Sequence, residues 1–198
     1  GAWLSSDGRR VLTWGESGAA QLWDAETGAA IGKPMRHPRV QGADGPADAA
    51  IFAARVTQGE RRLMTLASDG TARLWTLDKQ EPVGSTIEHD GLSGGNFSED
   101  ASRIVTWGRD GFARVWDEEG APLAAIPLPH DTEWAGAAFS SDGARLVTWT
   151  DNGDARRFEA QVWSVGPDAA AIGPLIVHPW GLGMSWGDDA NNTSVGAA

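Results

Sequence analysis

Histidine is the side chain best suited to acid–base chemistry near neutral pH, and this chain has four of them. All four occupy the same place in four similar segments: His37, His89, His130 and His178. Two of these segments are "TGAAIGKPMRH" (27–37) and "KQEPVGSTIEH" (79–89). Because every histidine belongs to a repeated position, none is left over as a general base. The pattern indicates a structural role for all four.

Other reactive groups are scarce. The chain has no cysteine, which excludes a thiol nucleophile, a thiolate metal site and a disulfide. No His or carboxylate cluster has zinc-ligand spacing, and no Gly-rich segment has a phosphate-binding pattern. Short acidic turns at 150–159 and 187–189 come nearest to a calcium loop. We expect no metal ion, no cofactor and no catalytic residue, so the protein is predicted not to be an enzyme.

The formal net charge of −11, from 27 acidic and 16 basic residues, limits the partners. Binding to nucleic acid or to an anionic membrane relies on Lys and Arg, so neither partner is expected. No apolar run approaches the roughly 20 residues of a membrane-spanning helix. No signal peptide is visible in the sequence, and we expect a cytoplasmic protein.

The elements that position the histidines emerge when the chain is aligned on a repeated threonine. Four segments match: "VLTWGESGAAQLW" (11–23), "LMTLASDGTARLW" (63–75), "IVTWGRDGFARVW" (104–116) and "LVTWTDNGDARRF" (146–158). Their threonines are 52, 41 and 42 residues apart. Short runs rich in Val, Leu, Ile and Thr are separated by Asp-Gly, Asn-Gly or Ser-Gly turns, which predicts four short strands in each unit.

A period of about 40–45 residues with four strands per unit is typical of a β-propeller blade. The predicted fold is therefore an all-β propeller with four-stranded antiparallel blades and four repeat units in this chain. One domain is expected over residues 1–190. Its units are 1–37, 38–89, 90–130 and 131–178, followed by a closing innermost strand at 179–190 and a flexible tail at 191–198.

The order His, Phe-Ser-x-Asp-Gly, Thr, Asp-Gly, Leu-Trp-Asp resembles the WD-repeat family of β-propellers over essentially the whole chain. The resemblance implies a buried hydrogen-bonded tetrad in each blade: the His, the Thr, the Asp of the second turn and the Trp of the third strand. Such a network satisfies both imidazole nitrogens and the indole N–H. Carried over by position, the tetrads are His37, Thr65, Asp69 and Trp75; His89, Thr106, Asp110 and Trp116; His130, Thr148, Asn152 and Trp163; and His178, Thr13, Ser17 and Trp23.

The third of these tetrads departs from the pattern. Asn152 replaces the Asp, and an unbroken register places Phe158 at the aromatic position. Five residues later, "AQVW" (160–163) matches "AQLW" (20–23). This match favours Trp163 and predicts a five-residue insertion in the second hairpin of the unit.

The fourth tetrad joins the two ends of the sequence. The first unit has no preceding His, and His178 has no following Thr or Trp. Because the two deficits are complementary, His178 is predicted to meet Thr13, Ser17 and Trp23, either within the chain or in a neighbouring copy. Three assemblies are compatible with four units: part of a longer propeller, an eight-bladed ring of two chains, and a closed four-bladed ring.

Several tryptophans lie outside the tetrads. Trp14, Trp107 and Trp149 directly follow the repeated Thr, so they are expected to pack between blades. Trp134 and Trp180 lie in loops that approach the upper face of a propeller. An exposed Trp is a frequent anchor at protein interfaces, which makes both residues candidate contacts to a partner.

Two further surface features have alternative interpretations. The long loop at 38–51, with Arg39 and Asp44 as candidate partner contacts, is either a binding loop or a mobile one. Acidic residues gather in the turns at the opposite end of the units: Asp7, Asp24, Glu26, Asp78, Glu99, Asp100, Asp117, Glu118, Glu119 and Asp142. They either keep an exposed face solvated or dock a basic partner.

The resemblance implies a non-catalytic scaffold, or a sensor or docking module, that presents a rigid propeller face to a protein or peptide partner. The alternative is a propeller hydrolase or small-ligand binder that uses carboxylates at the central channel. Fold alone does not decide between them.

Overall fold

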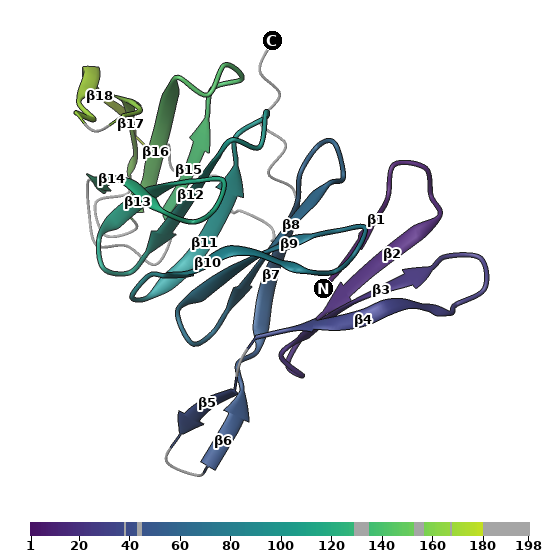
Figure 1. The fold of residues 1–198 in the computed structure, drawn as a ribbon. Helices are drawn as coiled ribbons and strands as arrows, with labels where there is room; N and C mark the ends of the chain where they lie inside the picture. Colours follow the sequence, from purple (N-terminus) through teal and green to yellow (C-terminus); the bar gives the residue numbers. More distant parts are fainter. Residues whose placement is uncertain (38, 43–44, 129–134, 153–156, 167, 180–198) are drawn as a thin grey trace.

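The computed structural model describes residues 1–37, 39–42, 45–128, 135–152, 157–166 and 168–179. It shows four antiparallel sheets of four strands each, together with a two-stranded hairpin (Figure 1). The described residues form no helix, and so none that could cross a membrane. The prediction of an all-β fold with four-stranded antiparallel units is confirmed.

Each sheet takes its four strands from one repeat unit, and strands that follow one another in the chain are neighbours. The first sheet contains β1 (Ala2–Leu4), β2 (Arg10–Trp14), β3 (Ala19–Asp24) and β4 (Ala30–Arg36). The second contains β7 (Ile51–Val56), β8 (Arg62–Ala67), β9 (Thr71–Thr76) and β10 (Pro82–Glu88). The third contains β11 (Leu92–Phe97), β12 (Arg103–Gly108), β13 (Phe112–Asp117) and β14 (Pro122–Pro127). The fourth contains β15 (Ala135–Phe139), β16 (Arg145–Asn152), β17 (Arg157–Ser164) and β18 (Ala171–Pro179).

The third sheet shows why the second strand of each unit is apolar throughout. Successive residues of a strand point to opposite faces of the sheet. Val105 is packed against the fourth sheet, whereas Ile104 is packed against the second. Both faces of the sheet are therefore covered. As a result, Ile104, Val105 and Thr106 are all fully buried in a continuous run.

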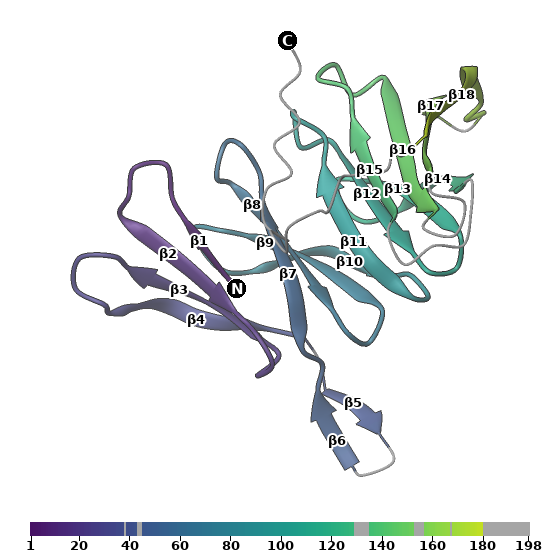
Figure 2. The same cartoon turned by 180° about the vertical axis from the view of Figure 1, so that it is seen from behind.

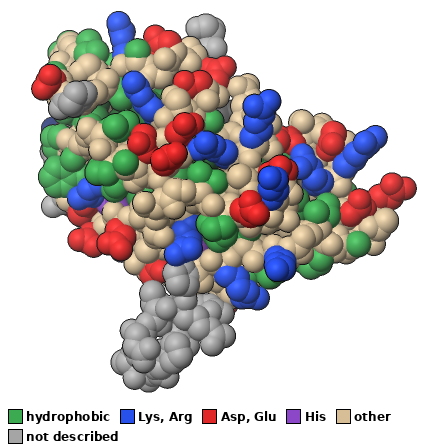
Figure 3. All heavy atoms as spheres, viewed as in Figure 1, with side chains coloured by type: hydrophobic (Ala, Val, Ile, Leu, Met, Phe, Trp, Pro, Cys, Tyr) green, Lys and Arg blue, Asp and Glu red, His purple; other side chains and the backbone are tan. Residues whose placement is uncertain are grey.

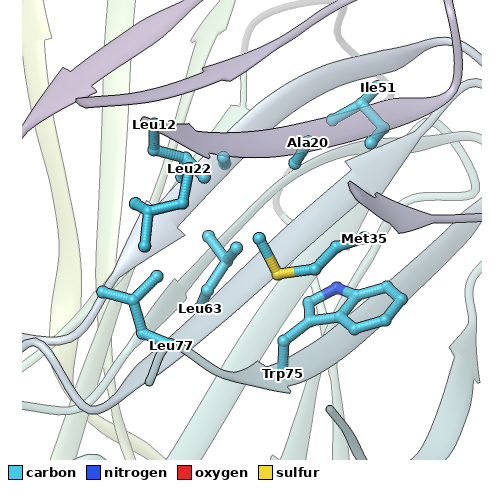
Figure 4. Close-up of a cluster of buried hydrophobic side chains, with 9 residues drawn as sticks. Leu12, Ala20, Leu22, Met35, Ile51, Leu63, Trp75 and Leu77 are labelled. Atoms are coloured by element: carbon cyan, nitrogen blue, oxygen red, sulfur yellow. The ribbon is translucent and has the colours of Figure 1, made fainter. Parts of the chain in front are cut away.

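The sheets pack face to face in a row, with a hydrophobic cluster between each pair of neighbours. Figure 4 shows the cluster between the first two sheets, where Leu12 and Leu22 meet Leu63 and Leu77. The first and fourth sheets lie at opposite ends of the row (Figures 1 and 2). The described sheets thus form an open row, and closure into a four-bladed ring, one of the three assemblies compatible with the repeat number, is not seen within them.

Arginine side chains at one repeat position also join neighbouring sheets. This position lies three residues before the repeated Thr. The bonds run from Arg10 to the Glu60 carboxylate (2.9 Å), from Arg62 to the Glu118 carbonyl (2.6 Å) and from Arg103 to the Gly143 carbonyl (2.7 Å). Each arginine therefore reaches a turn of the following sheet.

The segment predicted as a long loop at 38–51 contains a hairpin. Its strands are β5 (Arg39–Gly42) and β6 (Gly45–Asp48), with Arg39 opposite Asp48. The hairpin projects away from the row of sheets (Figures 1 and 2). Pairing the two halves of the segment satisfies backbone groups that an irregular loop would leave to water.

The first sheet takes its first strand from the start of the chain. Leu4 of β1 pairs with Val11 of β2, so β1 occupies the edge that the sequence assigned to a closing strand at 179–190. Pro179 instead ends β18 in the fourth sheet. Residues 180–198 lie outside the described residues, so the rest of that strand and the predicted tail at 191–198 stay predictions.

Glycines on the first strands make room for the tryptophans that follow the repeated Thr. Gly94 is paired with Trp107, and a Cβ on Gly94 would overlap the Trp107 indole. Gly1 and Gly136 have the same relation to Trp14 and Trp149. The close contact explains why glycine stands opposite each of these tryptophans.

Gly94→Ala is expected to lower the free energy of unfolding by about 1–3 kcal/mol, because the added methyl group forces the Trp107 ring out of its packing. Urea unfolding followed by circular dichroism measures the loss. Gly59→Ala is the matched control, since Gly59 has open space around it and an ordinary φ angle. Equal stabilities of the two variants would contradict the packing argument.

Candidate functional site

The first buried tetrad joins the first and second sheets around His37. Its Nε2 lies 2.8 Å from Thr65 Oγ1, and its Nδ1 lies 2.9 Å from Thr71 Oγ1. Trp75 Nε1 donates to Thr65 Oγ1 at 2.9 Å, and Thr71 Oγ1 donates to Asp69 at 2.7 Å. Because the Thr71 proton goes to the carboxylate, Thr71 accepts from His37 Nδ1–H, and His37 Nε2 accepts from the Thr65 hydroxyl. The structure brings the predicted residues together, with Thr71 as an additional link.

The second tetrad joins the second and third sheets around His89. Its Nδ1 lies 2.7 Å from Thr106 Oγ1, and its Nε2 lies 3.1 Å from Asp110 Oδ1. Trp116 Nε1 donates to Thr106 Oγ1 at 2.9 Å. Arg114 pairs with the other oxygen of Asp110. The chain of bonds therefore runs from the indole through the hydroxyl and the imidazole to the carboxylate.

The two histidines direct different ring nitrogens toward the aspartate of their network. His37 directs Nδ1, and His89 directs Nε2. In the second sheet Thr71 stands two residues after Asp69, and its hydroxyl fits between the imidazole and the carboxylate. In the third sheet the same position is Phe112, which has no hydroxyl, and His89 bonds Asp110 directly. One side chain outside the tetrad thus accounts for the difference.

Burial holds both histidines in the neutral form. It lowers the pKa of His37 to about 4, and it also lowers the pKa of His89. Both nitrogens of each ring are already hydrogen-bonded inside the protein. These imidazoles therefore have no nitrogen to offer a substrate or a metal ion.

The third predicted tetrad is described in part. Trp163 Nε1 donates to Thr148 Oγ1 at 2.9 Å, and Phe158 lies beyond it, opposite Asp151, in a longer hairpin. The structure thus places Trp163, and not Phe158, beside the repeated Thr. His130 and the side chain of Asn152 lie outside the described residues.

A matching glutamine supports the same alignment. Gln161 Nε2 donates to the Val162 and Ile172 carbonyls, at 3.0 and 3.4 Å. Gln21 makes the equivalent bonds to Leu22 and Ile31, at 2.8 and 3.0 Å. The "AQLW" and "AQVW" segments therefore occupy equivalent places in the first and fourth sheets.

The fourth predicted tetrad is not assembled within the described chain. Trp23 Nε1 donates to Thr13 Oγ1 at 2.8 Å, so two of its members meet. His178 is exposed on β18 of the fourth sheet, at the other end of the row, and Ser17 is exposed in the first sheet. Closure of this tetrad within one chain is therefore not observed.

The acidic residues of the predicted charged face close turns. Five of them accept backbone N–H groups of their own turns: Asp7, Asp24, Asp100, Asp117 and Asp142. Hydrogen bonds from Ser98 and Ser102 lower the pKa of Asp100 to about 2. Acidic and basic side chains are interspersed on the face seen in Figure 3. Turn formation explains why these acidic residues recur, so their recurrence does not require a basic partner protein.

Two of the tryptophans outside the tetrads pack between neighbouring sheets, and a third lies on an end face of the row. Trp14 packs against the cluster between the first two sheets, and Trp107 packs against the cluster between the third and fourth, as predicted. Trp149 is half-buried on the face of the fourth sheet that points away from the third. Trp134 and Trp180 lie outside the described residues.

The other candidate partner contacts are Arg39 and Asp44. Arg39 begins β5 of the projecting hairpin, and its side chain is not described. Asp44 lies outside the described residues. Both therefore stay predictions. No group of three or more His, Cys, Asp or Glu within the described ranges could hold a metal ion.

A hollow of about 560 Å³ opens where turns of the second and third sheets meet, at the end of the sheets that carries His89. It is lined by Phe52, Ser68, Asp69, Gly70, Asp90, Gly91, Leu92, Ser93 and Arg109. Phe52, on the edge strand β7, is 43% exposed. The hollow thus combines one accessible aromatic side chain with carboxylates and a guanidinium group.

Backbone hydrogen bonds hold the walls of this hollow together. His89 N–H donates to the Gly70 carbonyl, and Leu92 N–H donates to the His89 carbonyl. Arg109 N–H donates to the Gly91 carbonyl at 2.8 Å. Backbone hydrogen bonds therefore join the turns of the second and third sheets around the opening. Sequence reasoning missed Phe52, Asp90 and Arg109, because the hollow forms between two sheets and no motif marks it.

The sequence of this chain is similar to those of several curated proteins. No family model matches the chain. The chain is 30% identical over 122 residues to the protein Groucho of Drosophila melanogaster, a WD-repeat protein. The matched stretch covers 61% of this chain and 16% of Groucho, so the chain spans a small part of the length of this relative. The match and the repeated four-stranded sheets agree with a WD-repeat architecture.

Proposed function

We propose that this protein is a non-catalytic WD-repeat module that binds a peptide segment of a partner protein in the hollow between the second and third sheets. The observation that carries the proposal is the exposed ring of Phe52 in a hollow whose walls are joined by backbone hydrogen bonds. A preformed site loses little conformational entropy when a ligand binds. The partial match to Groucho supports the same class of function.

The lining of the hollow specifies the chemistry of the peptide. Phe52 and Leu92 offer apolar surface, and Asp90 supplies a carboxylate beside it. A large apolar residue next to a Lys or Arg would satisfy both kinds of surface. The net charge of −11 also favours the approach of a basic segment.

The absence of catalytic activity is part of the proposal. The described histidines His37 and His89 are buried and fully bonded, and five of the acidic turn residues hold backbone N–H groups. These groups are engaged in structure. The alternative of a carboxylate-based hydrolase or small-ligand binder has no observation of its own in favour of it.

Selection from a random peptide library displayed on phage tests the binding proposal. The expected result is enrichment of peptides with a large apolar residue adjacent to Lys or Arg. A synthetic peptide of the enriched sequence is then titrated by fluorescence polarisation. Phe52→Ala is expected to weaken its binding by at least about tenfold, as for an anchor residue at an interface. Asp90→Lys is expected to weaken binding of the basic residue.

Leu123→Ala is the matched control. Leu123 has the same exposure as Phe52, 42% against 43%, but it lies on β14, outside the hollow. Its substitution should leave peptide affinity unchanged. The proposal is wrong if no peptide is enriched, or if Phe52→Ala and Leu123→Ala bind an enriched peptide equally well.

A further inference from the structure

The first strands of the second and third sheets are irregular at equivalent positions. In β7 the register with β8 shifts at Phe52, which has no partner residue in β8. In β11 the register with β12 shifts at Ser93, which has no partner residue in β12. Phe52 lies 13 residues before Thr65, and Ser93 lies 13 residues before Thr106. Both strands therefore contain a β-bulge at the same position of the repeat.

The bulged residues of both strands line the hollow. A β-bulge inserts an extra residue into a strand, bends the strand and redirects the side chain at that point. Phe52 and Ser93 are both exposed, and both line the hollow between their sheets. The equivalent residue of the fourth sheet, Ala135, is paired with Thr150 and is half-buried. The second and third sheets thus each contribute one side chain to the hollow through the same irregularity.

The Ser93 hydroxyl is oriented as a hydrogen-bond acceptor. It donates its proton to the Gly91 carbonyl oxygen at 3.1 Å, and the same oxygen accepts from Arg109 N–H at 2.8 Å. A serine oxygen that donates its proton keeps two lone pairs for other donors. Asp90 also lines the hollow, and an ionised carboxylate can only accept. Ser93 and Asp90 therefore favour a ligand that brings N–H groups.

We propose that Ser93 is a specificity-determining residue: its Oγ accepts a hydrogen bond from a side-chain N–H of the peptide that Phe52 anchors. This inference rests on the proposed function and adds a second contact to it. The peptide lies across the hollow from β7 to β11, with its large apolar residue on Phe52 and a Gln, Asn, Lys or Arg on Ser93. A hydroxyl that is already oriented loses little freedom when the peptide binds.

Paired peptides test the role of Ser93. Gln or Met, which has a similar size but no N–H donor in its side chain, replaces each residue of an enriched peptide in turn, except the apolar anchor. Affinities are measured by fluorescence polarisation on the full chain. At one position Gln is expected to bind about threefold to tenfold more tightly than Met, as for one added hydrogen bond. Ser93→Ala should abolish that preference, whereas Phe52→Ala should weaken every peptide.

Ser85→Ala is the matched control. Ser85 is also an exposed serine on a strand, β10, but it lies outside the hollow. This variant should keep the preference for Gln. A Glu at the same peptide position should bind more weakly than Gln, because it offers no proton to Ser93 and is repelled by Asp90.

The possible outcomes separate this inference from the proposed function. If Ser93 only supports the turn at Gly91, Ser93→Ala will weaken the Gln and Met peptides alike, and the proposal is overturned. It is also overturned if no position prefers Gln, or if the wild-type protein prefers Glu to Gln there. In these cases binding through Phe52 is still observed and the proposed function stands. Failure to enrich any peptide overturns the proposed function itself, and this inference with it.

Discussion

Thr106→Val is expected to lower the free energy of unfolding by about 2–5 kcal/mol, the sum of two unsatisfied buried groups. The Thr106 hydroxyl is fully buried and serves both His89 Nδ1 and Trp116 Nε1. Valine has almost the same shape, so packing is retained. The imidazole and the indole N–H each lose a partner in a place that water does not reach. Urea unfolding at pH 7.5, followed by Trp fluorescence, measures the change.

Thr13→Val is the control for this prediction. Thr13 has the same place in the first sheet and the same bond from a tryptophan, but it has no histidine and is half-buried. Its substitution leaves one indole N–H that solvent can reach, so a loss below about 1 kcal/mol is expected. If both variants lose the same stability, the buried network does not hold the second and third sheets together as argued.

Acidification from pH 7 towards 5 is expected to destabilise the protein through its buried histidines. Burial lowers the pKa of His37 from 6.5 to about 4. Between these pH values, the unfolded chain therefore binds a proton that the folded chain does not bind. Stability is therefore complete above pH 6.5 and falls as the pH drops from 6.5 towards 4. The loss from His37 alone reaches about 2 kcal/mol at pH 5. The lowered pKa of His89 adds a loss of the same sign.

Urea unfolding between pH 7.5 and 5 measures this dependence. The lower limit matters because the carboxylate of Asp100, with a pKa lowered to about 2, stays charged there and contributes no change. His37→Gln should reduce the slope of stability against pH, since one of the two buried imidazoles in the described residues is removed. A wild-type stability that is constant from pH 7 to 5 would show that the histidines are not held neutral.

The strand content could be predicted because it depends on local spacing, whereas the tetrads were implied by the resemblance to WD-repeat proteins. Thr106 and Trp116 are ten residues apart on adjacent strands of one hairpin, and the turn length sets their register. The same reasoning identified Trp163 through the repeated "AQVW" segment, despite the insertion. Alternation of apolar residues and Gly-containing turns determined the four strands of every unit.

Contacts between sheets could not be predicted in the same way. The orientation of the two imidazole rings depends on Thr71 and Phe112, which the repeat pattern leaves variable. The hollow at Phe52 forms from turns of two different units, so no single motif contains it. The hairpin at Arg39–Asp48 has too little apolar alternation to be distinguished from a loop.

The sequence by itself determined the all-β units and their number in this chain. The reason is that hydrogen-bond register and side-chain alternation act over a few residues. Only the tertiary structure decided that the four described sheets form an open row (Figures 1 and 2). The angle between packed sheets depends on how the side chains of two whole sheet faces pack together. Examples are the face of the second sheet that carries Leu63 and the face of the fourth sheet that carries Leu146. That packing is a property of the assembled surfaces, which a repeat pattern does not contain.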